Sequence, residues 1–273
     1  MTVGEAIRAA AERLAPVSDT ARLDAELLMA HLFGVTRSEL LLRHMRDPAP
    51  PGFAALVERR MSHEPVAYIT GRQEFYGLPF IVTPATLIPR GDSETLVEAA
   101  LAERPDAGRV LDLGTGSGAL LLAVLAHCRA GQGVGIDRSP EAVAVAARNA
   151  EALGLRPQAR FLEGDWHAGG WTEGLGTFDL ILCNPPYVES AASLDRQVAD
   201  FEPATALFAG PEGLDDYRVL IPQLRALMNS GGLAVLEIGA EQAETVGALA
   251  TASGFGAALR RDLAGRARAL LLT

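Results

Sequence analysis

The sequence contains no lysine, so all 24 of its basic residues are arginines. This absence excludes every reaction that needs a lysine amine, such as Schiff-base formation. There are only two cysteines, Cys128 and Cys183, which cannot build a disulfide framework. Both lie in apolar stretches, so we expect buried and inert thiols. The five histidines show no metal-ligand spacing, and we predict no metal site.

Long apolar runs are also missing. No uninterrupted apolar run is long enough to span a bilayer, and the first residues lack the basic and apolar regions of a signal peptide. We therefore expect a cytoplasmic protein. The 273 residues carry a net charge of −10. A duplex-DNA binder gains most of its affinity by neutralising phosphates, so this acidic balance disfavours a nucleic-acid partner, although a local basic patch would suffice.

The first part of the chain has helical patterns, and a β-rich segment follows it. Helices are expected at about 5–14, 21–33, 36–42 and 51–62, which predicts a small helical bundle. In the second helix we expect one buried side, formed by Leu23, Leu27, Leu28 and Met29. Residues 65–71 and 74–82 are β-rich and punctuated by Gly and Pro, which predicts a hairpin. We divide the chain into a helical domain at 1–72, a β-hairpin linker at 73–86 and a larger domain at 87–273.

From Arg109 onward, strand and helix patterns alternate. This alternation predicts an α/β fold with a Rossmann-like parallel sheet and right-handed crossovers. Strands are expected at 109–113, 133–137, 159–163, 178–183 and 232–238. Two more strands are expected at 256–261 and 266–272. The connection between these last two is too short for a parallel crossover, so they should form an antiparallel hairpin.

A glycine-rich loop follows the strand at 109–113. Glycines let the backbone turn sharply and approach a ligand closely, although a tight strand-to-helix turn alone would also use them. Asp112, just before the loop, would repel a phosphate and favour a cationic group. S-adenosylmethionine carries an ammonium and a sulfonium and has no phosphate, so we predict that this cofactor binds there. The loop consists of Gly114, Thr115, Gly116, Ser117 and Gly118.

Two later strand ends are expected to complete the cofactor site. Asp137 ends the next strand, where a carboxylate can accept both ribose hydroxyls. The alternative for Asp137 is capping of the following helix. Asp165 and Trp166 follow the third strand and offer a carboxylate and an aromatic surface beside an adenine. The alternative for Trp166 is plain core packing.

The tetrapeptide Asn184, Pro185, Pro186 and Tyr187 follows the buried strand at 178–183. Two prolines cannot continue a strand, so the chain must turn at the edge where open α/β sheets bind ligands. An amide, two carbonyls and an aromatic ring suit a planar NH2 group, whereas the alternative is a simple Pro-rich turn. The cofactor loop and the tetrapeptide follow strands one and four, which are neighbours in this fold class. We expect them to face each other across one crevice.

Together these motifs resemble class I S-adenosylmethionine-dependent methyltransferases that act on nitrogen. Further segments at 65–71, 74–78, 87–90 and 202–207 are similar to the protein-(glutamine-N5) methyltransferases of peptide chain release factors. The resemblance implies methylation of the glutamine side-chain amide in the Gly-Gly-Gln segment of class I release factors. It also implies that the helical domain helps to recognise the release factor. One position departs: the family usually has Pro after Arg90, where this chain has Gly91, and we expect a modest local effect.

An amide nitrogen is a poor nucleophile because its lone pair is delocalised into the carbonyl, so we expect orientation to matter more than a base. We hypothesise that the Asn184 side-chain oxygen and the Pro185 carbonyl each accept one N–H of the substrate amide. Tyr187 would pack against the flat amide, and the two prolines would keep the turn rigid. Three alternatives remain open: a glutamine methyltransferase of a large-subunit ribosomal protein, an adenine-N6 DNA methyltransferase, and a non-catalytic cofactor-binding scaffold.

Overall fold

We describe the protein from a computed structural model in which residues 1–128 and 131–273 are described. The chain divides into two compact units, and each is described by itself. The first unit contains Met1–Arg72 and Leu194–Phe201, and the second contains Gln73–Ser193 and Glu202–Thr273. No helix in the described ranges is long and apolar enough to cross a membrane.

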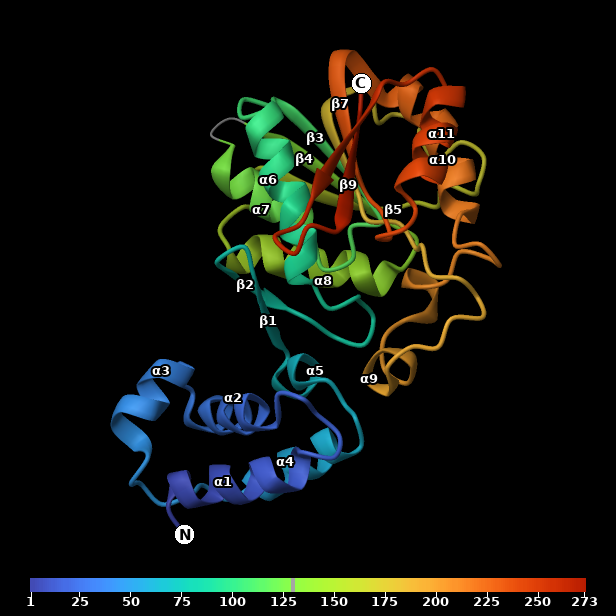
Figure 1. Cartoon of the computed structure of the whole chain (residues 1–273). Coiled ribbons are helices and arrows are strands. Elements are labelled where there is room, and N and C mark those ends of the chain that lie inside the picture. The colour runs from blue at the N-terminus through green and yellow to red at the C-terminus, as the bar shows by residue number, and fades with distance from the viewer. Residues whose placement is uncertain (129–130) are drawn as a thin grey trace. The chain divides into compact units, whose positions relative to one another are not determined.

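The first unit is a helical bundle (Figure 1), and its core is one cluster of buried apolar side chains. Its first helix begins with a reciprocal cap, in which the Glu5 side chain accepts from the Thr2 N–H at 2.8 Å and the Thr2 side chain accepts from the Glu5 N–H. Such caps satisfy backbone N–H groups that have no partner inside the helix. The helices are α1 (Val3–Leu14), α2 (Ala21–Phe33), α3 (Arg37–Glu39), the π-helical η1 (Leu40–His44), α4 (Phe53–Met61), α5 (Val66–Thr70) and α9 (Arg196–Ala199).

The α2 helix buries a different face from the one expected. Leu28 and Met29 are fully buried, but Leu23 and Leu27 are 39% and 36% exposed. The charged Asp24 takes an interior position instead, where it accepts a hydrogen bond of 2.7 Å from a buried arginine of α4. The prediction is confirmed for Leu28 and Met29 and was wrong for Leu23 and Leu27, because it assigned only apolar residues to the buried side and a paired charge can also be buried.

The segment at 65–71 is helical and not a strand. Pro65 precedes α5 with a φ of −59°, and Gly71 ends the helix in a left-handed conformation with a φ of 71°. Proline before a helix and glycine just after it are start and stop signals, and here they outweigh the β-branched residues between them. The hairpin itself consists of β1 (Arg72–Phe75) and β2 (Leu78–Ile81), so it begins two residues before the expected segment at 74–82.

The second unit contains a seven-stranded sheet with the order β5-β4-β3-β6-β7-β9-β8. The α/β prediction is confirmed, including the antiparallel pairing of the last two strands. The strands lie within a few residues of the expected ranges, because buried parallel strands have continuous apolar runs. They are β3 (Arg109–Leu113), β4 (Gln132–Asp137), β5 (Ala159–Glu163), β6 (Phe178–Cys183), β7 (Met228–Glu237), β8 (Ala257–Arg261) and β9 (Ala267–Leu272).

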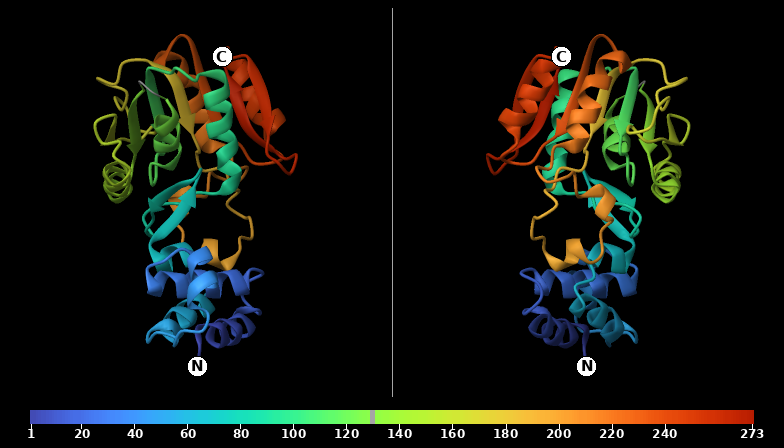
Figure 2. Two further views of the ribbon diagram at one scale, coloured as in Figure 1. Left: turned by 90° about the vertical axis from the view of Figure 1, so that its left-hand side faces the viewer. Right: turned by 90° about the vertical axis from the view of Figure 1, so that its right-hand side faces the viewer.

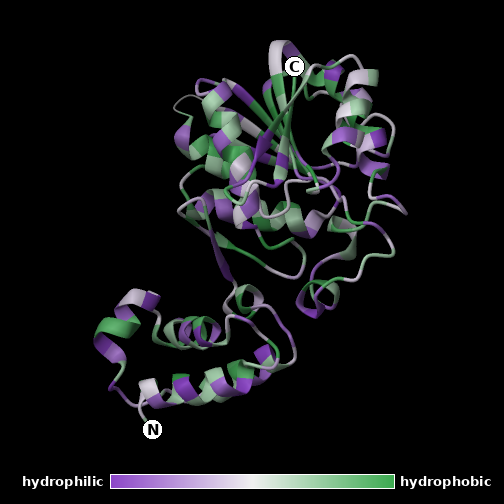
Figure 3. Cartoon of the chain, in the orientation of Figure 1, coloured by the Kyte–Doolittle hydropathy of each residue, from purple (hydrophilic) through white to green (hydrophobic). Residues whose placement is uncertain are grey.

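Helices cover both faces of this sheet, as Figures 1 and 2 show. One apolar cluster joins the sheet to α10 and α11, and another joins it to α6, α7 and α8. In Figure 3 the hydrophobic colour concentrates along the strands. The helical elements of the second unit are η2 (Gly91–Ser93), α6 (Glu94–Glu103), α7 (Ala119–His127), α8 (Pro140–Ala152), η3 (Ala204–Ala206), α10 (Asp215–Leu227) and α11 (Ala243–Ala252).

The strand order reverses between β3 and β6. These neighbours are parallel, and Leu113 lies opposite Cys183 at their carboxyl ends. Open α/β sheets bind ligands at such a switch point, because the loops that leave the two strands diverge to opposite faces. The loop after β3 is the glycine-rich segment and the loop after β6 is the Asn-Pro-Pro-Tyr segment. The sheet therefore brings together the two motifs that the sequence singled out.

Candidate active site

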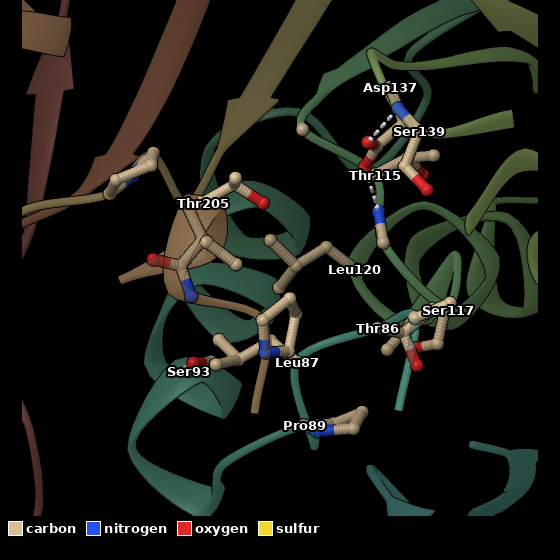
Figure 4. Close-up of a pocket in the computed structure, with 18 of the residues that line it drawn as sticks. Thr86, Leu87, Pro89, Ser93, Thr115, Ser117, Leu120, Asp137, Ser139 and Thr205 are labelled. Atoms are coloured by element: carbon tan, nitrogen blue, oxygen red, sulfur yellow. Dashed lines mark hydrogen bonds between the residues drawn. The ribbon is translucent and has the colours of Figure 1, made fainter. Parts of the chain in front are cut away.

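A cavity opens at the carboxyl ends of the central strands, and Figure 4 shows part of its lining. On one side lie Thr115 and Ser117 of the glycine loop, with Asp137 at the end of β4 and Ser139 just after it. On the other side lie residues that precede α6 and residues that follow β6. All of the lining residues belong to the second unit. The cavity is therefore complete within that unit.

The glycine loop needs its glycines. Gly114, Gly116 and Gly118 have φ values of 71°, 53° and 81°, a region that residues with a Cβ rarely adopt. A Cβ on Gly114 would lie 3.2 Å from the Trp166 ring, and one on Gly118 would lie 3.1 Å from a Leu122 methyl group. The loop therefore packs closely against its neighbours while its other side lines the cavity.

Asp137 lines the cavity and also holds the loop. Its Oδ2 accepts from the Gly116 N–H at 2.8 Å, and its Oδ1 accepts from the Ser139 N–H at 2.9 Å. The side chain that caps α8 belongs to Ser139, which accepts from the Ala142 N–H. Capping therefore does not account for Asp137. Each carboxylate oxygen has a second acceptor site, which leaves room for ribose hydroxyls.

Asp112 lies outside the cavity lining and is only 1% exposed. Its Oδ2 accepts a hydrogen bond of 2.6 Å from the Thr115 hydroxyl, whereas its Oδ1 finds no partner among the described residues. Burial raises the pKa of Asp112 to about 7, the hydrogen bond from Thr115 opposes this shift, and the negative charge of Asp137 adds to it. A cationic ligand group bound at the loop would offset this buried carboxylate, so the residues fit the expected cofactor.

Trp166 forms part of the cavity wall and is 9% exposed. Its indole N–H donates to the Asp216 Oδ1 at 2.8 Å, and the His167 Nε2 lies 2.9 Å from the same oxygen. Asp216 also lines the cavity. It was not predicted from the sequence, because an acidic residue in the first turn of a helix has an ordinary explanation in the helix dipole. Asp165 does not line the cavity, and its Oδ1 accepts from the His167 N–H.

The tetrapeptide after β6 is only partly in the cavity wall. Asn184 and Pro186 line the cavity, whereas Pro185 and Tyr187 do not. No described residue forms a hydrogen bond with the Asn184 side chain, so its amide is available to a ligand. Both prolines are buried, which keeps the turn rigid.

Tyr187 is half-buried, and hydrogen bonds hold both its side-chain hydroxyl and its backbone carbonyl. Its hydroxyl donates to the Glu237 Oε1 at 3.1 Å, and its carbonyl accepts from the Gln242 Nε2 at 3.2 Å. Burial and the negative charge of Glu237 raise the pKa of the Tyr187 hydroxyl, so it stays protonated and able to donate. Glu237 was not predicted from the sequence, because nothing in the neighbouring residues distinguishes it from any other acidic residue at a strand end.

Two further segments meet beside the cavity. Glu202 is buried, accepts from the Ile88 N–H at 3.1 Å and forms an ion pair with Arg90. Arg90 lines the cavity, as do Pro203 and Thr205. The segments at 87–90 and 202–207, which carried part of the family resemblance, therefore form one wall together. Among the described residues no cluster of His, Cys, Asp and Glu could hold a metal ion.

The fold and this cavity define a class I methyltransferase. Residues 105–249 match a family model described as a methyltransferase domain, and residues 5–71 match one described as the PrmC N-terminal domain. The chain is also similar in fold to a methyltransferase from Pyrococcus furiosus. The TM-score is 0.52 at 18% identity, covering 72% of this chain and 89% of the other. The chain is accordingly an S-adenosylmethionine-dependent methyltransferase.

Curated relatives identify the particular family. The chain is 44% identical over 257 residues to the release factor glutamine methyltransferase of Rhodospirillum rubrum, covering 92% of this chain and 78% of the relative. It is 42% identical to the enzyme of the same name from Cereibacter sphaeroides, covering 98% and 97%. For the enzyme from Moorella thermoacetica the identity is 41%, covering 99% and 98%. The chain belongs to the release factor glutamine methyltransferase family.

Proposed function

We propose that this chain methylates the side-chain amide nitrogen of the glutamine in the Gly-Gly-Gln segment of a peptide chain release factor. One observation carries the proposal: the Asn184 amide is free and lines the same cavity as the glycine loop. A methyl donor and a planar NH2 acceptor can therefore meet in this cavity. The family membership supports release factors as the protein that carries this glutamine.

The residues that would hold the cofactor surround one side of the cavity. S-adenosylmethionine supplies, when bound, a methyl group activated by its sulfonium. The glycine loop allows close approach of the backbone, and Asp137 offers acceptors to the ribose hydroxyls. Trp166 offers an apolar surface, and Asp112 lowers the cost of placing a cation near the loop. Asp165 is the weakest member of this set, because it lies outside the cavity lining.

The residues after β6 would orient the nucleophile. We propose that the Asn184 side-chain oxygen and the Pro185 carbonyl each accept one N–H of the substrate amide. These two hydrogen bonds aim the nitrogen lone pair and favour its pyramidal geometry. Holding two reactants in such an arrangement can supply about 7–11 kcal/mol of the barrier reduction. Pro185 and Pro186 keep the acceptors in place. Tyr187 lies outside the cavity lining, so we propose that it supports this turn from behind and does not pack directly against the amide.

The helical unit Met1–Arg72 is proposed to recognise the release factor. Its match to the PrmC N-terminal domain supports this role. Because the proposed substrate acts in translation, we also place the reaction in the cytoplasm.

A methyl-transfer assay that offers alternative substrates in parallel tests the proposal. The chain is incubated with radiolabelled S-adenosylmethionine and either a release factor, a large-subunit ribosomal protein or duplex DNA. We expect label on the release factor alone. Label on the ribosomal protein or on the DNA, with none on the release factor, would replace the proposed substrate by that alternative.

A further inference from the structure

A buried carboxylate lies directly behind the cavity wall. Glu237 is the last residue of β7 and is 2% exposed. Its Oε2 accepts a hydrogen bond of 2.6 Å from the Ser93 hydroxyl, and its Oε1 accepts one of 3.1 Å from Tyr187. Ser93 lines the cavity, as Figure 4 shows, and Tyr187 ends the proposed amide-binding turn. One side chain therefore connects two elements of the site that are far apart in sequence.

The surroundings keep this carboxylate in place. The Tyr217 hydroxyl donates to the Glu237 carbonyl at 2.6 Å, which fixes the backbone at the end of β7. Arg268 of β9 is 8% exposed and places its positive charge near the carboxylate. Burial raises the pKa of Glu237, and the hydrogen bonds from Ser93 and Tyr187 together with Arg268 oppose that shift. Because both oxygens accept from a hydroxyl, the arrangement matches a carboxylate and not a protonated acid.

Tyr187 is also fixed on its backbone side. Gln242 donates to the Tyr187 carbonyl and to the Gly213 carbonyl, at 3.2 Å and 3.1 Å. A Cβ on Gly213 would lie 2.2 Å from the Tyr187 oxygen, so only glycine permits this approach. With its backbone held there, the remaining freedom of Tyr187 is the direction of its ring, and the hydrogen bond to Glu237 sets that direction.

We propose that Glu237 is a positioning residue for methyl transfer, which holds the Ser93 hydroxyl in the wall of the substrate cavity and the Tyr187 ring behind the amide-binding turn. This inference rests on the proposed function. Ser93 donates its only hydroxyl proton to Glu237, so it presents lone pairs to the cavity. It is then an acceptor for an N–H group of the bound substrate. Glu237 thus fixes the orientation of the Tyr187 ring and makes the Ser93 hydroxyl a hydrogen-bond acceptor toward the cavity.

The substitution Glu237→Gln tests this role with little change in shape. Ser93 and Tyr187 donate to different oxygens of Glu237, and a glutamine replaces one of these oxygens by an NH2 group that cannot accept, so one of the two hydroxyls loses its acceptor. We expect kcat for release factor methylation to fall about 10- to 100-fold, the scale of a small misplacement of a reactant. We expect the Kd for S-adenosylmethionine, measured by calorimetry, to stay within about twofold, because Glu237 does not line the cavity.

A mutant cycle tests whether Glu237→Gln lowers kcat through Tyr187 and Ser93 or by disturbing the fold in general. In the Tyr187→Phe/Ser93→Ala background, both hydroxyls that Glu237 holds are absent. Adding Glu237→Gln there should lower kcat by less than about twofold. The matched control is Asn229→Ala, which removes hydrogen bonds to Thr177 and Asp179 away from the cavity. This control should lower the melting temperature while kcat stays near the wild-type value.

A spectroscopic measurement follows the ring without turnover. The chain has four tyrosines, so 19F NMR of protein labelled with 3-fluorotyrosine gives few resonances, and Tyr187→Phe identifies the one from Tyr187. We expect Glu237→Gln to shift or broaden that resonance.

The inference is overturned if the resonance is unmoved, or if Glu237→Gln retains wild-type kcat while the wild-type protein methylates release factor. Absence of methylation by the wild-type protein would instead contradict the proposed function. If Glu237→Gln does not fold, Tyr187→Phe and Ser93→Ala each still have to lower kcat.

Discussion

At the scale of single residues, Asn184 is the side chain on which the proposed chemistry depends most directly. It lines the cavity, and its amide has no partner among the described residues. Its removal should therefore cost catalysis and not folding, because no internal hydrogen bond is lost.

The substitution Asn184→Ala is expected to lower kcat by about 10²–10³-fold, the usual cost of removing one preorganised hydrogen-bonding group from a site. Cofactor binding should remain measurable by calorimetry. Asn229→Ala is the matched control, since Asn229 bonds to Thr177 and Asp179 away from the cavity. Near-normal turnover by Asn184→Ala would contradict the amide-clamp mechanism.

Asp112 gives a prediction about pH. Its pKa in the folded protein is about 7, above the ordinary value of 3.8, so the folded state keeps a proton that the unfolded state releases. Stability from this group is therefore present at low pH and is lost as the pH rises toward 7. Relative to Asp112→Asn, the wild-type free energy of unfolding should fall by about 1.4 kcal/mol per pH unit between pH 5 and pH 7. Urea denaturation without cofactor measures this difference, and parallel pH profiles would contradict the assignment.

At the scale of elements, one buried side chain links the hairpin to the cofactor loop. Asn149 of α8 is fully buried. Its Oδ1 accepts from the Ile81 N–H at 2.7 Å, and its Nδ2 donates to the carbonyls of Ile81 and Ser117 at 3.0 Å and 2.8 Å. The end of β2 and the glycine loop are therefore fixed to the same helix.

The substitution Asn149→Ala should weaken both attachments. It leaves buried backbone groups of Ile81 and Ser117 without partners, at a cost on the order of 3 kcal/mol in the free energy of unfolding. Because Ser117 lines the cavity, the Kd for S-adenosylmethionine should also rise. Denaturation and calorimetry on the same preparation check the two effects. A loss of stability with an unchanged Kd would show that the loop does not depend on Asn149.

Gly91, the first residue of η2, is a position where a substitution is expected to raise the stability of the protein. It begins η2 with open space around the position of a Cβ, and its N–H finds no acceptor in the described ranges. Arg90 before it is extended, with φ −102° and ψ 143°, as a residue before proline must be. Gly91→Pro should therefore raise the free energy of unfolding by about 0.4–1 kcal/mol, measured by urea denaturation. A decrease would mean that the N–H or the backbone angle at Gly91 is needed.

The elements also show which features a sequence can predict. The strands of the sheet were predictable, because short continuous apolar runs that alternate with helical segments and are bounded by glycines and prolines are typical of buried parallel strands. The helix at Val66–Thr70 was not predictable. It has only five residues, and the β-branched residues among them favour a strand, whereas the flanking proline and glycine favour a helix. Glu237 and Asp216 were also missed. Their partners lie far away in sequence, and only the fold brings Ser93 or Trp166 to them.

At the scale of the whole molecule, we expect the two compact units to have different roles, with the chemistry in one and recognition of the release factor in the other. The unit that holds the sheet contains every residue that lines the cavity, so the proposed chemistry needs no side chain from the helical unit. The helical unit has its own apolar core and matches its own family model. We therefore expect substitutions on its surface to change KM for the release factor and to leave kcat unaffected.

The central claim is that the cavity presents a protein glutamine amide to the methyl donor. The most direct measurement is tandem mass spectrometry of a release factor after reaction with this chain and S-adenosylmethionine. The account predicts a single added methyl group on the side chain of the Gly-Gly-Gln glutamine, and none when that glutamine is replaced by glutamate. A methyl group on any other residue, or methylation that survives the replacement, would contradict it.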